Sequence, residues 1–142
     1  MNGDLLARMR EEFDLTESEP TLVAPLILAH LGDAVYEVVT RVIVASKGNR
    51  PINSVHRDNV RMVSATTQAK MADILEEHLS EDELNQYKRG RNAKSATSAK
   101  NASLHDYRKA TGFEALIGYL FLCGKDDRIL ELCKLGFEKL KL

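Results

Sequence analysis

Two acidic residues lie inside stretches of sequence that are otherwise almost entirely apolar. Asp33 lies within LILAHLGDAVYEVVTRVIV, and Glu114 lies within TGFEALIGYLFLC. Such stretches are typical of buried helices, and an ionised carboxylate in a core needs a cation, a hydrogen-bond donor or a cleft. A glycine directly precedes Asp33, and two more flank Glu114, which indicates close approach of another backbone or of a ligand. The two acids therefore mark a candidate site.

One interpretation of this pair is a metal centre. Helices that pack together often present carboxylates to a metal ion in the core between them. No His or Cys cluster accompanies the acids, and oxygen ligands favour Mg²⁺ or Mn²⁺ over zinc. Hydrated Mg²⁺ needs only one or two protein carboxylates, because water and phosphate oxygens complete its octahedron. Asp33 and Glu114 are the expected ligands in this interpretation.

The other interpretation is a set of internal salt bridges. Glu37 follows Asp33 by four residues, and Arg41 follows Glu37 by four, while His30 precedes them on the same side. Residues at this spacing share one face of a helix. These residues would form a polar stripe along the helix. In this alternative Arg41 neutralises both Asp33 and Glu37, and Arg41 or Arg108 pairs with Glu114. The residues alone leave both interpretations open.

A basic segment lies between residues 88 and 109. It holds seven Lys and Arg residues and one acid, whereas the whole chain has a net charge of −1. Side chains of this kind suit contacts with phosphate and sugar, and the lack of interleaved aromatic residues disfavours stacking on single-stranded bases. The predicted RNA-binding residues are Arg89, Arg91, Lys94, Lys100 and Asn101. On composition alone, a solvated charged loop is the alternative.

Helical periodicity predicts an all-α domain of about six or seven helices. The expected elements are a short helix or ordered arm over 5–13, a long helix from 21 or 25 to 46, helices over 53–63 and about 64–78, a helix over 80–90, and two helices over 104–122 and about 129–140. Asn53 and Ser80 are the expected N-caps of two of them. The segment 92–103 has no apolar period and is predicted to be a mobile surface loop.

The bulk properties are those of a cytoplasmic globular protein. The chain has 142 residues, 44% of them hydrophobic and 29% charged, which fits one domain. Cys123 and Cys133 form no metal-binding motif and are expected to be reduced and at least partly buried. The N-terminus lacks the apolar core of a signal peptide, and the longest apolar stretch, 22–44, carries too many ionisable residues for a membrane span.

These segments resemble a known family. LAHLGDAVYEVVTR resembles the signature helix of ribonuclease III catalytic domains, and TGFEALIGYLFL resembles their second acidic motif. VHRDNVRMVSATTQAKM and YKRGRNAKSATSAKN are similar to Mini-ribonuclease III, the short bacterial branch of that superfamily. The resemblance covers roughly residues 22–140. It implies an N-terminal arm or short helix over 1–20 and a catalytic domain with the all-helical ribonuclease III endonuclease fold over 21–142.

The resemblance also implies a chemistry. Asp33 and Glu114 match the family's acidic positions, so they would be the catalytic residues and would bind Mg²⁺, with Mn²⁺ as a substitute. The metal would activate a water for in-line attack on a phosphodiester of double-stranded RNA, leaving 5′-phosphate and 3′-hydroxyl ends. Glu37 and Arg41 would have supporting roles. Family members are homodimers, and the Mini-ribonuclease III branch matures large-subunit (23S) ribosomal RNA precursors with help from a ribosomal protein.

The sequence departs from full-length ribonuclease III in three respects. Ala29 and Thr111 stand where that enzyme usually has Glu and Asp, and no segment corresponds to its double-stranded RNA-binding domain. Two acids fewer imply a less tightly held metal and slower, more substrate-restricted cutting. The two missing acids also leave open the alternative that the protein is catalytically idle and only binds RNA or a ribosome. A helical protein-interaction module with an internal salt-bridge stripe is a third alternative.

Overall fold

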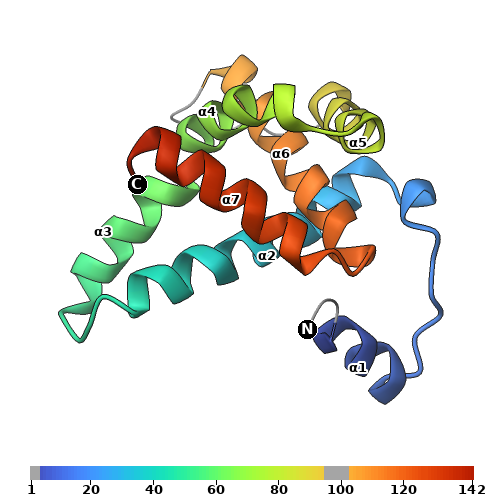
Figure 1. The fold of residues 1–142 in the computed structure, drawn as a ribbon, viewed down its shortest axis with the longest axis horizontal. Helices are drawn as coiled ribbons and strands as arrows, with labels where there is room; N and C mark the ends of the chain where they lie inside the picture. The colour runs from blue at the N-terminus through green and yellow to red at the C-terminus, as the bar shows by residue number, and fades with distance from the viewer. Residues whose placement is uncertain (1–3, 95–102) are drawn as a thin grey trace.

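The computed structural model describes residues 4–94 and 103–142, which form a helical bundle without strands in these ranges (Figure 1). Its helices are α1 (Asp4–Glu12), α2 (Pro25–Ala45), α3 (Ile52–Val63), α4 (Ala65–Leu75), α5 (Glu81–Asn92), α6 (Leu104–Leu122) and α7 (Asp126–Leu140), with 3-10 turns η1 (Pro20–Leu22) and η2 (Glu76–His78). The predicted all-α class is confirmed. Most of the predicted surface loop, with Lys100 and Asn101, lies outside the described residues.

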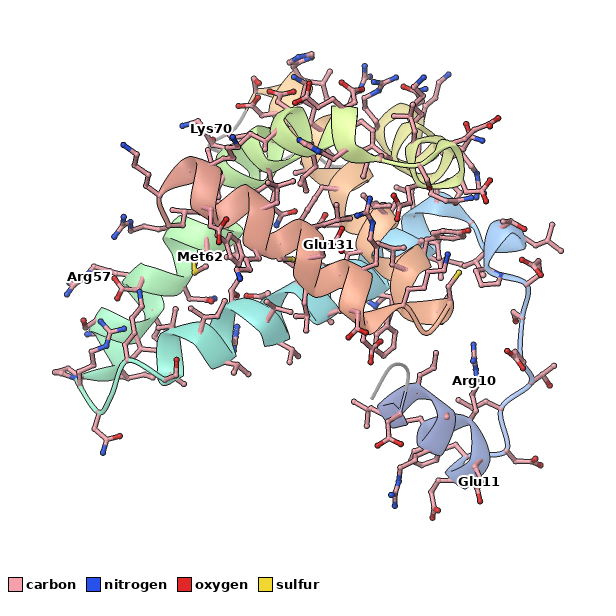
Figure 2. The ribbon with its side chains drawn as sticks, viewed as in Figure 1. Arg10, Glu11, Arg57, Met62, Lys70 and Glu131 are labelled. Carbon is pink, nitrogen blue, oxygen red and sulfur yellow. The ribbon has the colours of Figure 1, made fainter. Side chains whose placement is uncertain are left out.

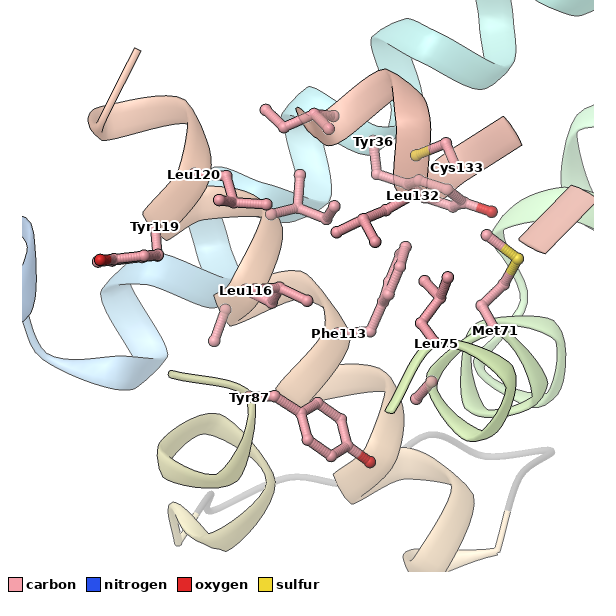
Figure 3. Packing of buried hydrophobic residues seen from close by; sticks show 14 of the residues in the cluster. Tyr36, Met71, Leu75, Tyr87, Phe113, Leu116, Tyr119, Leu120, Leu132 and Cys133 are labelled. Carbon is pink, nitrogen blue, oxygen red and sulfur yellow. The ribbon is translucent and has the colours of Figure 1, made fainter. Parts of the chain in front are cut away.

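Helix α6 lies at the centre of the bundle. Every residue from Ala110 to Leu120 except Glu114 is buried, and the helix packs against α2, α4 and α5. Phe113 of α6 meets the edge of Tyr36 of α2, with ring centroids 5.0 Å apart and planes at 88°. Leu132 of α7 and Leu75 of α4 close the core around them (Figure 3). The apolar sequence of α6 is thus explained by neighbours on all sides.

Two glycines let α2 and α6 touch through their backbones. A methyl group added to Gly32 would lie 1.7 Å from the carbonyl oxygen of Glu114, and one added to Gly118 would lie 2.0 Å from that of Leu28. No side chain larger than hydrogen fits between the helices at these two points. The contact places Asp33, the residue after Gly32, beside Glu114.

Helices α3 and α4 form a hairpin that packs beside this contact. Ser64 ends α3 and caps α4, its hydroxyl accepting a hydrogen bond from the Thr67 amide at 3.2 Å. The Tyr36 hydroxyl of α2 donates to the Met62 carbonyl at 2.6 Å and so fixes the end of α3. The Asn53 cap prediction is wrong, because α3 begins at Ile52 with no capping side chain.

The remaining local predictions are largely confirmed. Ser80 and Glu83 form the predicted reciprocal capping box at the start of α5. Both cysteines are free, Cys133 buried and Cys123 half-buried. Within the described ranges no helix is both long and apolar enough to cross a membrane.

Helix α1 lies at the edge of the bundle and joins it through an extended segment (Figure 1). Leu6 is its only buried residue in the described part, and Arg10 reaches the end of α6, where its guanidinium donates to the Leu122 carbonyl at 3.5 Å (Figure 2). Residues 11–19 are all exposed. Residues 4–12 therefore form a short helix with little buried surface.

Candidate active site and metal centre

Asp33 is at the surface of this chain, which corrects the expectation that its helix is buried all round. The core side of α2 is formed by Leu28, Ala29, Gly32, Tyr36, Thr40 and Val44. The polar stripe lies beside that side, and Asp33 itself is exposed. The all-round apolar sequence has a different cause: α2 carries a second apolar stripe with Ile27, Val38 and Val42, which the rest of the described residues leave exposed.

Glu114 is the carboxylate that the fold encloses. Burial, together with hydrogen bonding to and charge repulsion from the adjacent Asp33 carboxylate, raises the pKa of Glu114 to about 9. A hydrogen bond from Gln68 opposes this rise, and the charge of Glu37 adds to it. Three acids, Asp33, Glu37 and Glu114, therefore lie close together, and in the described part of the chain no basic side chain forms an ion pair with Glu114.

Glu37 is held by neighbours on α2 and α3. Its Oε1 accepts hydrogen bonds from Arg41 Nη2 and from Asn59 Nδ2, both at 3.3 Å. Asn59 in turn accepts a 2.7 Å hydrogen bond from the Thr40 hydroxyl. Arg41 pairs with Glu37 alone and is mostly exposed, so it does not neutralise the whole stripe. The internal salt-bridge alternative is not supported in the described ranges, because neither Arg41 nor Arg108 forms an ion pair with Asp33 or Glu114 there.

Sequence reasoning missed two buried amides at this site. Asn59 is 7% exposed and Gln68 is 3% exposed. Each comes from the α3–α4 hairpin, and each reaches one of the acids, Glu37 or Glu114. In the sequence both residues look like ordinary polar positions of amphipathic helices, and only the hairpin geometry turns them towards the acids.

The positions that usually carry acids in ribonuclease III supply no ligands. Ala29 is buried, and the Thr111 hydroxyl donates back to the Tyr107 carbonyl of its own helix at 3.0 Å. Among the described residues no three His, Cys, Asp or Glu side chains are arranged to hold a metal. The carboxylates that the fold brings together are therefore a pair, Asp33 and Glu114, with Glu37 close to Glu114.

This pair fits a hydrated Mg²⁺ or Mn²⁺. Mg²⁺ keeps several waters and is commonly bound through one or two carboxylates plus substrate phosphates. The raised pKa of Glu114 has a physical meaning here, since a cation between the two carboxylates would remove the repulsion from Asp33 that contributes to it. A zinc site is not suggested, since no imidazole or thiolate joins the pair.

The predicted RNA-binding residues divide into two groups. Arg89 is structural in this fold, because its guanidinium donates to the carbonyls of Thr21 and Val23 and to Gln86 at 2.7–3.2 Å. Arg91 is half-exposed, and Lys94 is exposed at the end of the described segment. Lys100 and Asn101 fall outside the described residues.

A basic pocket joins Arg91 to residues that sequence reasoning had not selected. A cavity of about 220 Å³ lies between the end of α5 and the start of α6, lined by Arg91, Asn92, His105, Arg108 and Lys109. Lys109 is paired with Asp73 at 2.6 Å, and Arg91 approaches Glu76 at 3.8 Å. The sequence did contain a signal for this pocket, because basic residues occur on both sides of the loop. The predicted RNA-binding residues did not include Arg108 and Lys109, which follow the loop.

Comparison with known proteins agrees with this geometry. A family model described as the ribonuclease III domain matches residues 26–125. The chain is 51% identical over 119 residues to a Mini-ribonuclease 3 from Brevibacillus brevis, covering 84% of this chain and 89% of that protein. It is 45% identical over 126 residues to a Mini-ribonuclease 3 from Clostridium tetani, covering 88% and 82%. A crystal structure of a Fusobacterium nucleatum protein superposes with a TM-score of 0.80 at 25% identity, covering 85% of this chain and 99% of that one.

One family thus matches most of the length of this helical domain. The matched part includes the two carboxylates and the glycines at the contact between α2 and α6. The chain belongs to the ribonuclease III family and, within it, to the Mini-ribonuclease 3 group. It is an endoribonuclease, and the family to which it belongs acts on double-stranded RNA.

Proposed function

We propose that this endoribonuclease cleaves double-stranded RNA with a Mg²⁺ ion, or Mn²⁺ in its place, held by Asp33 and Glu114. The observation that carries the proposal is the facing pair of carboxylates at the α2–α6 backbone contact. When bound, the metal would supply Lewis-acid stabilisation and an activated water for hydrolysis of the phosphodiester. The chain's own contribution is to hold the two carboxylates together and to leave Asp33 open to solvent.

Glu37 and Arg41 support the site in this proposal. Asn59 and Arg41 fix the Glu37 carboxylate, which adds negative potential next to Glu114. This negative potential favours a cation at the pair of carboxylates. In the described contacts, Arg41 is the basic side chain that pairs with Glu37. The absent acids at Ala29 and Thr111 restrict the protein ligands to two, so we expect weak metal binding that is completed by water and RNA phosphate.

The proposed RNA surface includes Arg91, Lys94, Lys100, Asn101 and the basic pocket. Arginine, lysine and asparagine side chains suit phosphate and sugar oxygens, which supply most of the affinity for a duplex. Arg108 adds an exposed guanidinium to this surface. Arg89, although predicted from sequence, contributes mainly by fixing the segment before α2.

We propose further that the protein acts as a homodimer through the exposed apolar stripe of α2. Ile27, Val38 and Val42 are 61–63% exposed there, and Leu130 of α7 is 53% exposed beside them. Three large aliphatic side chains along one helix are a costly surface for an isolated chain, and a second copy would cover them. Asp33 lies on the same helix as the stripe, so a dimer formed through α2 would bring the two helices that carry the sites together.

The proposed substrate is the precursor of large-subunit (23S) ribosomal RNA in the cytoplasm, processed with the help of a ribosomal protein. Similarity to the Mini-ribonuclease III branch supports this, rather than any single residue. The test is incubation of the purified protein with precursor RNA and with an unrelated duplex, in Mg²⁺ and in a chelator. We expect metal-dependent cuts with 5′-phosphate ends and faster cutting of the precursor. Intact precursor in Mg²⁺ and Mn²⁺ would contradict the proposal.

A further inference from the structure

Gln68 is a buried polar side chain that the proposed reaction does not yet explain. It lies on α4, which packs against α6, and it is 3% exposed. Its amide nitrogen donates to the Val63 carbonyl at 2.9 Å. The side chain also lies close enough to the Glu114 carboxylate to lower the pKa of Glu114 by hydrogen bonding. A side-chain amide has two N–H donors, so both contacts can exist at once.

The amide is an expensive residue for packing alone. Its carbonyl oxygen is buried and has no hydrogen-bond partner within the described part of the chain. An unsatisfied buried carbonyl destabilises the folded state, a cost that methionine of similar volume would not carry. A buried polar group with an unsatisfied atom calls for a reason other than stability. The contact with Glu114 supplies one.

Among the other described neighbours, Asp33 is the side chain that hydrogen-bonds to Glu114. Asp33 and Glu37 repel its charge. Thr111, one turn earlier on α6, directs its hydroxyl to the backbone of its own helix, and Ala29 on α2 has no polar atoms. Gln68, by contrast, ties Glu114 to the end of α3 through Val63.

We propose that Gln68 is a positioning residue that orients the Glu114 carboxylate towards Asp33 so that both can share one cation. Orientation from a neighbouring amide thus replaces part of what additional acids at positions 29 and 111 would supply. This inference rests on the proposed metal site at Asp33 and Glu114.

The test measures Mn²⁺ affinity by titration calorimetry and thermal unfolding of the metal-free, full-length protein. The variants are Gln68→Met and Gln68→Leu, with Gln86→Met as a matched control and Asp33→Asn as a control for the site. Gln86 is a 5% exposed amide on α5 that accepts a hydrogen bond from Arg89 and does not contact either carboxylate. Residues that orient metal ligands typically change affinity by about 10–100-fold.

We expect Gln68→Met and Gln68→Leu to weaken Mn²⁺ binding at least about 10-fold, while the melting temperature of the metal-free protein changes little. Gln86→Met should bind Mn²⁺ as the wild type does. Wild-type affinity in both Gln68 variants, with binding lost in Asp33→Asn, would overturn the role of Gln68 and leave the metal site standing. Wild-type affinity in Asp33→Asn would overturn the metal site and this inference with it. Collapse of the fold in both Gln68 variants would also contradict it, because it requires that an apolar residue fits.

Discussion

Gly32→Ala is the substitution that most directly probes the contact between α2 and α6. The added methyl carbon would lie 1.7 Å from the Glu114 carbonyl oxygen and 2.7 Å from the Gly118 nitrogen, whereas ordinary contacts begin at 3.4 Å. Both obstacles are backbone atoms and cannot rotate away. The two helices must therefore move apart at this point by more than an ångström.

The expected loss of stability follows from two opposing effects. Alanine is favoured over glycine inside a helix by about 1 kcal/mol. Forcing a packed core apart costs about 1–3 kcal/mol and sometimes more, and here the separation disturbs the Tyr36–Phe113 contact as well. Since the required movement is large, we expect a net loss of about 2 kcal/mol, which for a domain of this size lowers the melting temperature by about 6 °C.

The activity should fall more steeply than the stability. The displaced carbonyl belongs to Glu114 itself, so the movement changes the distance between the two carboxylates. A misplacement of about 1 Å at a reacting centre can cost about 100-fold in rate. The assay compares thermal melts followed by circular dichroism with initial rates of duplex RNA cleavage, measured well below the melting temperature.

Gly136→Ala provides the matched control. It also adds a methyl group inside a helix, but the three atoms nearest to that group all belong to the Met71 side chain, with its sulfur and terminal carbon nearest. Methionine adapts readily, so we expect a change in stability below about 1 kcal/mol and unchanged cleavage. Equal losses in the two variants, or a Gly32→Ala protein as stable and active as the wild type, would refute the backbone contact as the element that positions the site.

Three further predictions concern the rest of the molecule. Burial opposes ionisation of Glu83, but hydrogen bonds from Arg128 at 2.8 and 2.9 Å and from the backbone outweigh it, so the pKa of Glu83 is lowered. The stability that Glu83 contributes is therefore complete above its unfolded pKa of about 4.3 and is lost as the pH falls through the folded value. Urea midpoints should drop over that acidic range, and Arg128→Met should flatten the drop; equal pH dependence in both proteins would argue against this ion pair. Val38→Glu should convert a dimer to a monomer in sedimentation, while Val60→Glu, an exposed valine on α3, should not; a dimer in both would place the interface elsewhere. Arg108→Gln should weaken duplex binding and reduce its slope against log salt concentration by about 1, and an unchanged slope would remove the basic pocket from the RNA surface.

The sequence was sufficient for the helices because their signals are local. The Ser80 capping box and the apolar period of α6 depend on residues within a few positions of one another, and both occur in the structure as predicted. The pairing of α2 with α6 was anticipated by the glycines beside Asp33 and Glu114. Their actual contact, backbone against backbone, depends on both helices at once and could be measured only in the fold.

The parts that sequence reasoning missed depend on long-range geometry. The apolar sequence of α2 predicted complete burial, yet it reflects a core stripe and an exposed stripe, which have the same composition. Gln68 and Asn59 carry no local signal, because amides are common on helix surfaces and only the α3–α4 hairpin turns them inward. Arg89 was predicted to bind RNA because it is positively charged. In the fold its guanidinium donates hydrogen bonds to backbone carbonyls instead.

The central claim, that Asp33 and Glu114 together hold the catalytic metal, is tested most directly by two conservative variants. Asp33→Asn and Glu114→Gln keep the size of each side chain and remove its charge. We expect both to abolish Mg²⁺-dependent cleavage of duplex RNA. At neutral pH Glu114→Gln should also raise the melting temperature of the metal-free protein, because a carboxyl group whose pKa is raised in the folded state must take up a proton on folding, and the neutral amide need not. Cleavage at the wild-type rate by either variant would contradict the claim.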